Sequence, residues 1–356
     1  MCALSLAAQP APAADACTRR PLVDAADGGP VRGVEDLAVD SARGRVYLSA
    51  YDRWTVADAI AAEDRPPSGG IHAVALDKLG TANGPLRVRE LTRHLDGAFH
   101  PHGIGFARAD GTARLFAVNH AWSRVDGDWR KRYRLAALAP DGNRLTRVMT
   151  LDAPALCRAN DVAARSPTTA YVTRDHGACR GVGRWLEMGL GLDRAKLLRV
   201  DLGGEPPVRT VADGLAMANG VTFSPDRERL AVAETRAERI RIYDADAVGD
   251  GPAATHPLPG GPDNLTWGES GHILAAVHES LMATGMARYR VLGRERAGNR
   301  VVALDPASGE PRTVFHDPQG TRLNMATAAV RVDGTLVAAG LLDDALLVCR
   351  LKDGAT

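Results

Sequence analysis

The stretch ANGVTFSPDRERLAVAE, residues 218–234, contains the pattern that decides the fold. A polar pair, Asn219 and Gly220, opens an alternating apolar strand; a Ser-Pro-Asp turn follows at 224–226, and a second apolar strand begins at Leu230. Period-two alternation with turn residues between the strands predicts an antiparallel hairpin and not a helix. This stretch therefore predicts an all-β protein.

The same pattern recurs six times along the chain. Equivalent points in the repeats are Glu35, His102, Asn160, Asn219, Asn264 and Thr327. They follow one another at roughly 45 to 67 residues, the size of a four-stranded propeller blade. Only residues 183–200 suggest a helix, so a two-domain α/β architecture is not favoured. We predict a six-bladed β-propeller that occupies residues 17–356 as a single domain and carries a short lid helix.

Composition and charge exclude several classes of protein. The chain has 356 residues, 45% of them apolar, and its 37 glycines and 21 prolines suit short strands joined by tight turns. Its 44 basic and 43 acidic residues leave a net charge of +1 without long runs of either sign, so no nucleic-acid partner is expected. No apolar stretch reaches about 18 residues, so no transmembrane segment is expected.

The N-terminus and the cysteines bear on localisation. Residues 1–16 are rich in small side chains and match either the end of a secretory leader or a disordered tail. Without Cys2, four cysteines remain, and they allow three pairings. A disulfide between Cys157 and Cys179, 22 residues apart, would explain both without a catalytic thiol. An exported protein would oxidise these cysteines, and we predict a secreted or periplasmic protein.

The polar residues that open the repeats predict a metal site. In a propeller the innermost strand of each blade lines the central channel, so these residues converge. Oxygen donors without thiolates favour calcium. One ion can take Glu35, Asn160, Asn219, Asp263 and Asn264. Asp36 and Asp161 must point the other way along their strands and could hold a second ion with a backbone carbonyl. Asn-Asp and Asn-Gly pairs often only make turns, but their recurrence at equivalent positions favours ligands.

Two histidines are candidates for acid–base chemistry. His102 opens an inner strand and His120 ends the next strand of the same repeat; a histidine beside a metal can activate water at neutral pH. A lone histidine is more often a core residue, and His100 is expected only to shape its loop. His278 is a candidate for the substrate pocket, with His176 less so. No Gly-x-Ser-x-Gly elbow or phosphate-binding glycine loop is present in the sequence.

Several motifs together resemble the paraoxonase/arylesterase family, which is related to the SMP-30/gluconolactonase superfamily. They are distributed in order over nearly the whole chain, from about Cys17 to Leu351. The motifs are GVEDL at 33–37, PHGI at 101–104, VNH at 118–120, NDV at 160–162, WLEMGLGL at 185–192, ANGVTFSPD at 218–226, DNL at 263–265 and LLVCRL at 346–351.

The resemblance implies roles for individual residues. The catalytic calcium would be held by Glu35, Asn160, Asn219, Asp263 and Asn264, and the structural calcium by Asp36, Asp161 and the carbonyl of Ile104. His102 and His120 would form a dyad that activates water. Cys17 and Cys349 would form a disulfide between the first and last strands. The substrate pocket would include Met217, where the family usually has a bulky aromatic residue, with His278 and Trp185 of the lid helix.

The sequence therefore predicts a calcium-dependent hydrolase of lactones or aryl esters. In this hypothesis calcium polarises the carbonyl and His102 deprotonates water, although Asp263 could act in its place. Two alternatives are kept: a gluconolactonase-type sugar lactonase, and a non-catalytic propeller that binds calcium for rigidity. The expected partner is a small lactone or ester; its identity and the oligomeric state are left open.

Overall fold

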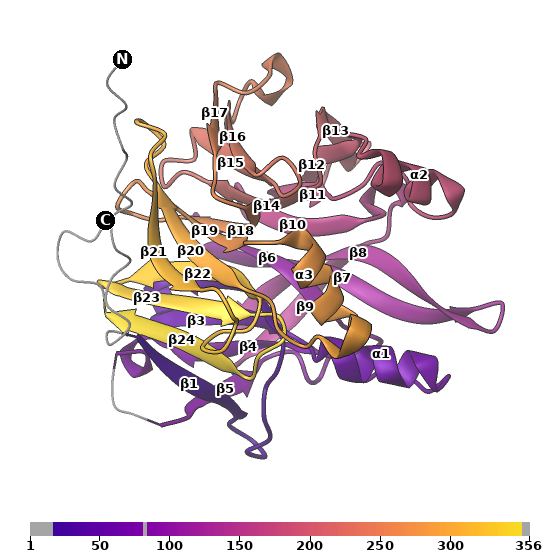
Figure 1. Cartoon of the computed structure of the whole chain (residues 1–356), viewed down its shortest axis with the longest axis vertical. Coiled ribbons are helices and arrows are strands. Elements are labelled where there is room, and N and C mark those ends of the chain that lie inside the picture. Colours follow the sequence, from indigo (N-terminus) through magenta and orange to yellow (C-terminus); the bar gives the residue numbers. More distant parts are fainter. Residues whose placement is uncertain (1–16, 81–83, 351–356) are drawn as a thin grey trace.

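A computed structural model describes residues 17–80 and 84–350, and in these the chain forms mainly β-strands. Residues 1–16, predicted to be a secretory leader or a disordered tail, lie outside the described residues. The strands form antiparallel four-stranded groups, and Figure 1 shows the sheets arranged around a common centre. Each innermost strand contacts the innermost strand of the next group, and the last contacts the first. The predicted propeller architecture is confirmed.

The strand order divides the sheets into six groups of four. The innermost strands are β2 (Val34–Asp40), β6 (Pro101–Ala109), β10 (Ala159–Ala164), β14 (Ala218–Phe223), β18 (Gly261–Trp267) and β22 (Ala326–Val332). The second strands are β3 (Arg45–Ala50), β7 (Thr112–Val125), β11 (Thr169–Arg174), β15 (Arg229–Glu234), β19 (Ile273–His278) and β23 (Thr335–Gly340). The third strands are β4 (Gly70–Ala75), β8 (Asp128–Asp141), β12 (Ala195–Asp201), β16 (Arg239–Asp244), β20 (Asn299–Leu304) and β24 (Ala345–Arg350). The outermost strands are β5 (Leu86–Glu90), β9 (Arg144–Leu151), β13 (Val208–Leu215), β17 (Ala254–Pro257), β21 (Pro311–Asp317) and, for the last group, β1 (Cys17–Asp24).

The first strand of the chain closes the ring. β1 pairs antiparallel with β24 and parallel with β5, and thereby joins the first and last groups into one eight-stranded sheet. Cys17 lies opposite Cys349 in this pairing and forms a disulfide with it, as the resemblance implied. A second disulfide joins Cys157 and Cys179. The two disulfides therefore use all four cysteines of the described residues.

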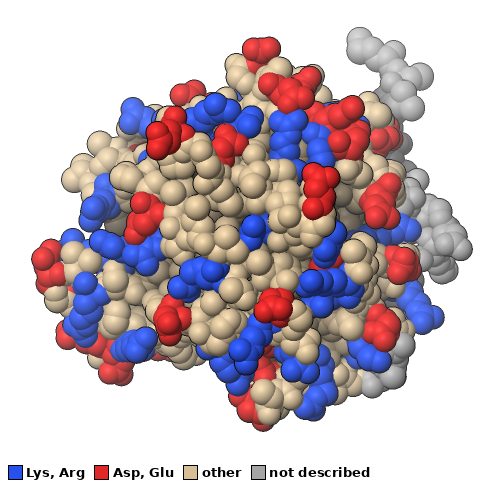
Figure 2. All heavy atoms as spheres, turned by 180° about the vertical axis from the view of Figure 1, so that it is seen from behind, with Lys and Arg blue, Asp and Glu red and all other residues tan. Residues whose placement is uncertain are grey.

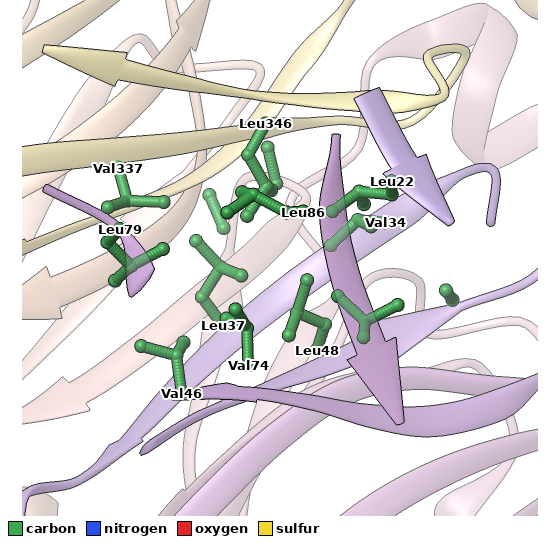
Figure 3. Packing of buried hydrophobic residues seen from close by; sticks show 14 of the residues in the cluster. Leu22, Val34, Leu37, Val46, Leu48, Val74, Leu79, Leu86, Val337 and Leu346 are labelled. Carbon is green, nitrogen blue, oxygen red and sulfur yellow. The ribbon is translucent and has the colours of Figure 1, made fainter. Parts of the chain in front are cut away.

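Apolar side chains fill the space between neighbouring sheets. In β3, Val46 and Leu48 pack into the cluster between the first and last groups, while Tyr47, between them in sequence, faces the cluster on the other side. Figure 3 shows the first of these clusters, to which Leu22 of β1 and Leu346 of β24 contribute from the closing seam. Because both faces of such a strand are buried, its sequence is a nearly continuous apolar run.

Over the described residues three α-helices lie outside the sheets, on the same side of the molecule in Figure 1. They are α1 (Arg53–Ala61), α2 (Val182–Leu190) and α3 (Leu281–Arg288). The helix expected over 183–200 is half as long as predicted, because Gly191 ends α2 with a left-handed φ of 60° and β12 begins at Ala195. None of the helices in the described residues is long and apolar enough to cross a membrane.

The ring-closing disulfide is expected to contribute more stability than the local one. It closes a loop of 332 residues, against 22 for Cys157–Cys179, and a longer loop restricts the unfolded chain more. Replacing Cys17 and Cys349 by serine should lower the free energy of unfolding by about 2–5 kcal/mol. The matched control replaces Cys157 and Cys179, and both are measured by denaturant titration. An equal or larger loss in the control would contradict the expected role of the seam.

Candidate active site and metal centre

A β-bulge opens every innermost strand at the same place. The register shifts fall between Val34 and Asp36, Pro101 and Ile104, Ala159 and Val162, Ala218 and Val221, Pro262 and Leu265, and Ala326 and Ala328. Each bulge contains one of the equivalent polar residues of the sequence repeats. A bulge leaves a residue outside the regular ladder and redirects its side chain. The six bulges therefore supply the channel with polar side chains.

Four of these side chains have buried oxygens without a hydrogen-bond partner. They are Glu35 Oε2, Asn160 Oδ1, Asn219 Oδ1 and Asn264 Oδ1. The Nδ2 of Asn264 donates to the backbone carbonyl of Glu35 at 2.9 Å and to its Oε1 at 3.2 Å, whereas the Oδ1 of Asn264 has no partner. Buried polar atoms without a partner are rare in folded proteins. Four such acceptor oxygens, on four different strands, form a set that could hold a cation.

The buried carboxyl groups near these oxygens would also be stabilised by a cation. Glu35 is 1% exposed, and burial, followed by repulsion from Asp263, raises its pKa to about 8. Asp263 is buried as well, and its Oδ2 lies 3.0 Å from His278 Nε2. Carboxylate and neutral amide oxygens in this number match the flexible coordination of calcium. The predicted catalytic set, Glu35, Asn160, Asn219, Asp263 and Asn264, thus has the chemistry of a calcium site.

The predicted second set differs because its carboxylates already have partners. Asp36 accepts the backbone N–H of Ile104 at 2.7 Å, and Asp161 accepts that of Val221 at 2.7 Å. Each contact joins two neighbouring innermost strands. Burial raises the pKa of both carboxyls, that of Asp161 to about 8, and each is further raised by neighbouring carboxylates. Asp36, Ile104 and Asp161 lie together at a cavity of about 610 Å³ at one mouth of the channel.

The two predicted catalytic histidines are in contact. The rings of His102 and His120 meet edge to face with centroids 4.2 Å apart, and both residues are buried. His120 Nε2 lies 2.8 Å from the carbonyl of Ala159 and must donate, since the carbonyl only accepts. His102 Nδ1 lies 2.7 Å from Glu35 Oε1, although the atoms are not aligned for a hydrogen bond. Burial lowers the pKa of both rings, so both are neutral at pH 7.

A cavity of about 1050 Å³ lies next to the histidine pair: neither His102 nor His120 lines it, but its lining residue Tyr133 contacts the ring of His120. Residues of α1, α2, α3 and the β7–β8 hairpin line it. Tyr133 is therefore the lining residue that connects the cavity to the pair, whereas Tyr51, also in the lining, contacts the ring of His100. His100 itself bonds to the carbonyl of Pro67 at 2.9 Å and stays outside the site, as expected.

The three side chains predicted for the substrate pocket are not among the residues that line this cavity. Trp185 is 74% exposed, on the solvent side of α2. His278 is buried behind Asp263, and Met217 precedes its strand with a left-handed φ of 61°. His176 pairs with Asp175 and Arg158. Arg53, Lys131 and Arg288 line the cavity but were not predicted from the sequence. The basic run at 130–132 was a signal that could have identified Lys131.

Another group of potential metal-binding residues lies at the outer edge of the sheets. Asp24, His72 and Glu90 bring one ligand atom each within 4.8 Å of one another, on β1, β4 and β5. Arg93 already bonds to both carboxylates, at 3.0 Å from Asp24 Oδ2 and 3.0 Å from Glu90 Oε2. Its charge occupies the place that a cation would take.

Comparison with known proteins places the chain among propeller proteins. A family model described as SMP-30/Gluconolactonase/LRE-like region matches residues 96–297. Serum paraoxonase/arylesterase 2 of Gallus gallus is 30% identical over 188 residues, which cover 52% of this chain and 49% of that protein. Serum paraoxonase/arylesterase 1 of Rattus norvegicus is 31% identical over 216 residues, covering 60% and 57%. The chain thus matches about half the length of the first of these relatives and somewhat more of the second.

Solved structures share the fold over nearly the full chain. A putative gluconolactonase superposes with a TM-score of 0.55 at 16% identity, covering 96% of this chain and 93% of that one. A luciferin-regenerating enzyme gives a TM-score of 0.53 at 14% identity, with 95% and 96% covered. The family model matches more than half of the 356 residues. By this match, and with the architecture described above, the chain belongs to the SMP-30/Gluconolactonase/LRE-like region family.

Proposed function

We propose that this chain is a calcium-dependent hydrolase that opens lactones or aryl esters with water. The observation that carries the proposal is the set of four buried oxygens without partners, on four strands, beside a buried histidine pair. The names of similar proteins support it. The curated relatives are paraoxonase/arylesterases, and the similar structures include a putative gluconolactonase and a regucalcin described as a calcium-binding protein.

In this proposal the chain's own residues position water and substrate. Calcium bound by Glu35, Asn160, Asn219, Asp263 and Asn264 would act as a Lewis acid toward the carbonyl oxygen of the substrate. His102 accepts the proton of the attacking water at Nε2, because its Nδ1 faces Glu35. His120 holds the ring of His102 by edge-to-face contact and is itself fixed by its bond to Ala159. Neutral imidazoles in this place are free to accept a proton.

Two further features belong to the same proposal. A second calcium at Asp36, Asp161 and Ile104 would offset the repulsion of two buried carboxylates at the other mouth of the channel. Export to an oxidising compartment is supported by the two disulfides, since such bonds persist mainly outside the cytosol.

Removal of calcium should abolish the activity reversibly. The measurement is hydrolysis of phenyl acetate and of a long-chain γ-lactone before and after EDTA, and again after calcium is restored. We expect both rates to fall with EDTA and to return, and the ratio of the two rates to indicate the substrate class. A protein that calcium stabilises but that turns over neither substrate, nor gluconolactone, would instead be a binding scaffold.

Asp263→Asn should weaken calcium binding by removing one charge from the ligand set with little change of shape. In the native protein, calcium at one hundred times its Kd should add about 2.7 kcal/mol to the free energy of unfolding. The variant should lose most of this gain at the same concentration.

The matched control for this variant is Asp40→Asn. Asp40 is a buried aspartate like Asp263, but it lies on β2. It pairs with Arg108 and accepts a hydrogen bond from Tyr47, away from the channel. The control should lower stability yet keep the full calcium-dependent gain. Equal calcium dependence in both variants would remove Asp263 from the ligand set.

His102→Gln should lower kcat by a factor of about 10²–10⁴, the range for loss of a general base. Calcium-dependent stability should persist, because the oxygen ligands are intact. His100→Gln is the control, a buried histidine two residues away whose ring bonds to the carbonyl of Pro67 and contacts the ring of Tyr51. Full turnover by His102→Gln on every substrate tested would show that the base lies elsewhere, with Asp263 the next candidate.

A further inference from the structure

The cavity next to the histidine pair is lined by an excess of positive charge. Eight of its lining residues are arginine or lysine, whereas Asp152 is the one acidic residue in the lining. The whole chain has nearly balanced charge, 44 basic against 43 acidic residues, and Figure 2 shows both signs intermixed over the face in view. The excess is therefore a local property of this cavity.

Part of the charge in the cavity is already compensated. Asp152 lies 2.8 Å from Arg134, outside the lining, and Arg158 bonds to Asp175 at 2.8 Å. Arg130 lies 3.5 Å from Asp128 and 3.9 Å from Asp126. Arg132 lies 3.9 Å from Asp152. Among the described residues, by contrast, five of the lining cations have no carboxylate within 4.0 Å: Arg53, Lys131, Arg180, Arg184 and Arg288. Three of these, Arg53, Lys131 and Arg288, have charges that act on the pKa of His102, and we call them the cationic trio.

Arg53 is the most buried member of the trio. It is 7% exposed, and its guanidinium lies over the ring of Tyr51 with Cζ 3.3 Å from the centroid. Nη1 donates to the carbonyl of Tyr51 at 2.8 Å, but Nε and Nη2 are buried without a partner. The neighbouring Asp52 caps α1 and accepts from two backbone amides instead of pairing with Arg53. Burying a charge with unpaired donors is costly, so a ligand with acceptor oxygens would be favoured here.

Lys131 and Arg288 are half-buried and face the same space. Lys131 Nζ lies 5.2 Å from the centroid of the Trp122 ring, a cation–π contact that leaves its positive charge without a carboxylate partner. Burial lowers the pKa of Lys131 to about 7, and the charges of Arg288, Arg158 and Arg53 act in the same direction. The trio therefore repels itself, and an anion between its members would relieve that repulsion.

The trio is also close to the proposed reaction centre. The charges of Arg53, Arg288 and Lys131 lower the pKa of His102, and those of Arg53 and Arg288 oppose the rise in the pKa of Glu35. Tyr133 lines the cavity between Arg158 and the ring of His120. One substrate molecule could therefore contact the trio with one group while its ester bond lies beside His102.

We propose that this enzyme selects lactones or esters that carry a negatively charged carboxylate, which Arg53, Lys131 and Arg288 bind while the ester bond lies at the histidine pair. The inference rests on the proposed hydrolase function and adds the substrate class. Arginine supplies paired donors in the geometry of a carboxylate, and lysine adds a point charge. A neutral substrate of the same shape leaves the trio uncompensated.

The test uses substrate pairs that differ in one charge: 4-acetoxybenzoate against 4-acetoxybenzamide, and γ-butyrolactone-γ-carboxylate against its primary amide. The native protein should give a kcat/KM about tenfold or more higher for the charged member. The preference should shrink with added salt, which screens charge. Lys131→Met and Arg288→Met should each lower the charged-to-neutral ratio by about tenfold, the effect of one charged hydrogen bond. Both positions are half-buried, so these variants avoid the core position of Arg53.

The matched control is Arg130→Met, which lines the same cavity but pairs with Asp128 and should keep the ratio. A native ratio near one with calcium-dependent turnover of both members, or an unchanged ratio in both trio variants, would overturn the inference and leave the proposed hydrolase intact. If phenyl acetate, the long-chain γ-lactone and both members of each pair are all left unhydrolysed, the hydrolase proposal fails, and titration calorimetry with 4-hydroxybenzoate and 4-hydroxybenzamide tests the anion site alone. Selective binding of the benzoate that Lys131→Met abolishes would support the site; equal binding of the two would reject it.

Discussion

Closure of the ring by its first strand is the constraint on which the site depends. β1 lies between β24 and β5, so the two ends of the described chain are held in one sheet. The polar groups at the channel come from distant positions; the bonded pair Glu35 and Asn264 is 229 residues apart in sequence. Such groups meet because each sheet positions the next, and the last sheet is joined to the first.

The site was predictable from sequence where its determinants are local. Each innermost strand begins with a bulge whose polar residue stands at a fixed place in a hairpin repeat, so Glu35, Asn160 and Asn219 could be found from spacing alone. The residues that line the cavity were not predictable from the sequence, because whether a loop residue faces the cavity depends on the loops of other sheets. The short helices α1 and α3 were missed too, although their capping residues Asp52 and Ser280 were visible in the sequence.

Charge is layered along the channel. Buried carboxylates lie along it, and towards one mouth Asp36 and Asp161 also tie neighbouring innermost strands together through backbone amides. Uncompensated arginine and lysine side chains surround the cavity next to the histidine pair. Each layer is unfavourable in isolation, since buried like charges repel. Their proximity lowers the electrostatic cost of both, as the partial offset of the Glu35 pKa by Arg53 and Arg288 indicates. The charges of the channel carboxylates and of the basic cavity residues therefore affect both the stability of the fold and the binding of a ligand.

The seam between β1 and β24 has a consequence for how the protein is made. During synthesis β1 emerges before the other described strands, while its antiparallel partner β24 emerges after all of them. The other four-stranded sheets consist of consecutive segments and can form as they leave the ribosome. The sheet that contains β1 and β24 can form only once β24 has emerged, so until then the nascent chain carries unpaired strand edges at the seam. The ring therefore closes after its other sheets have been made.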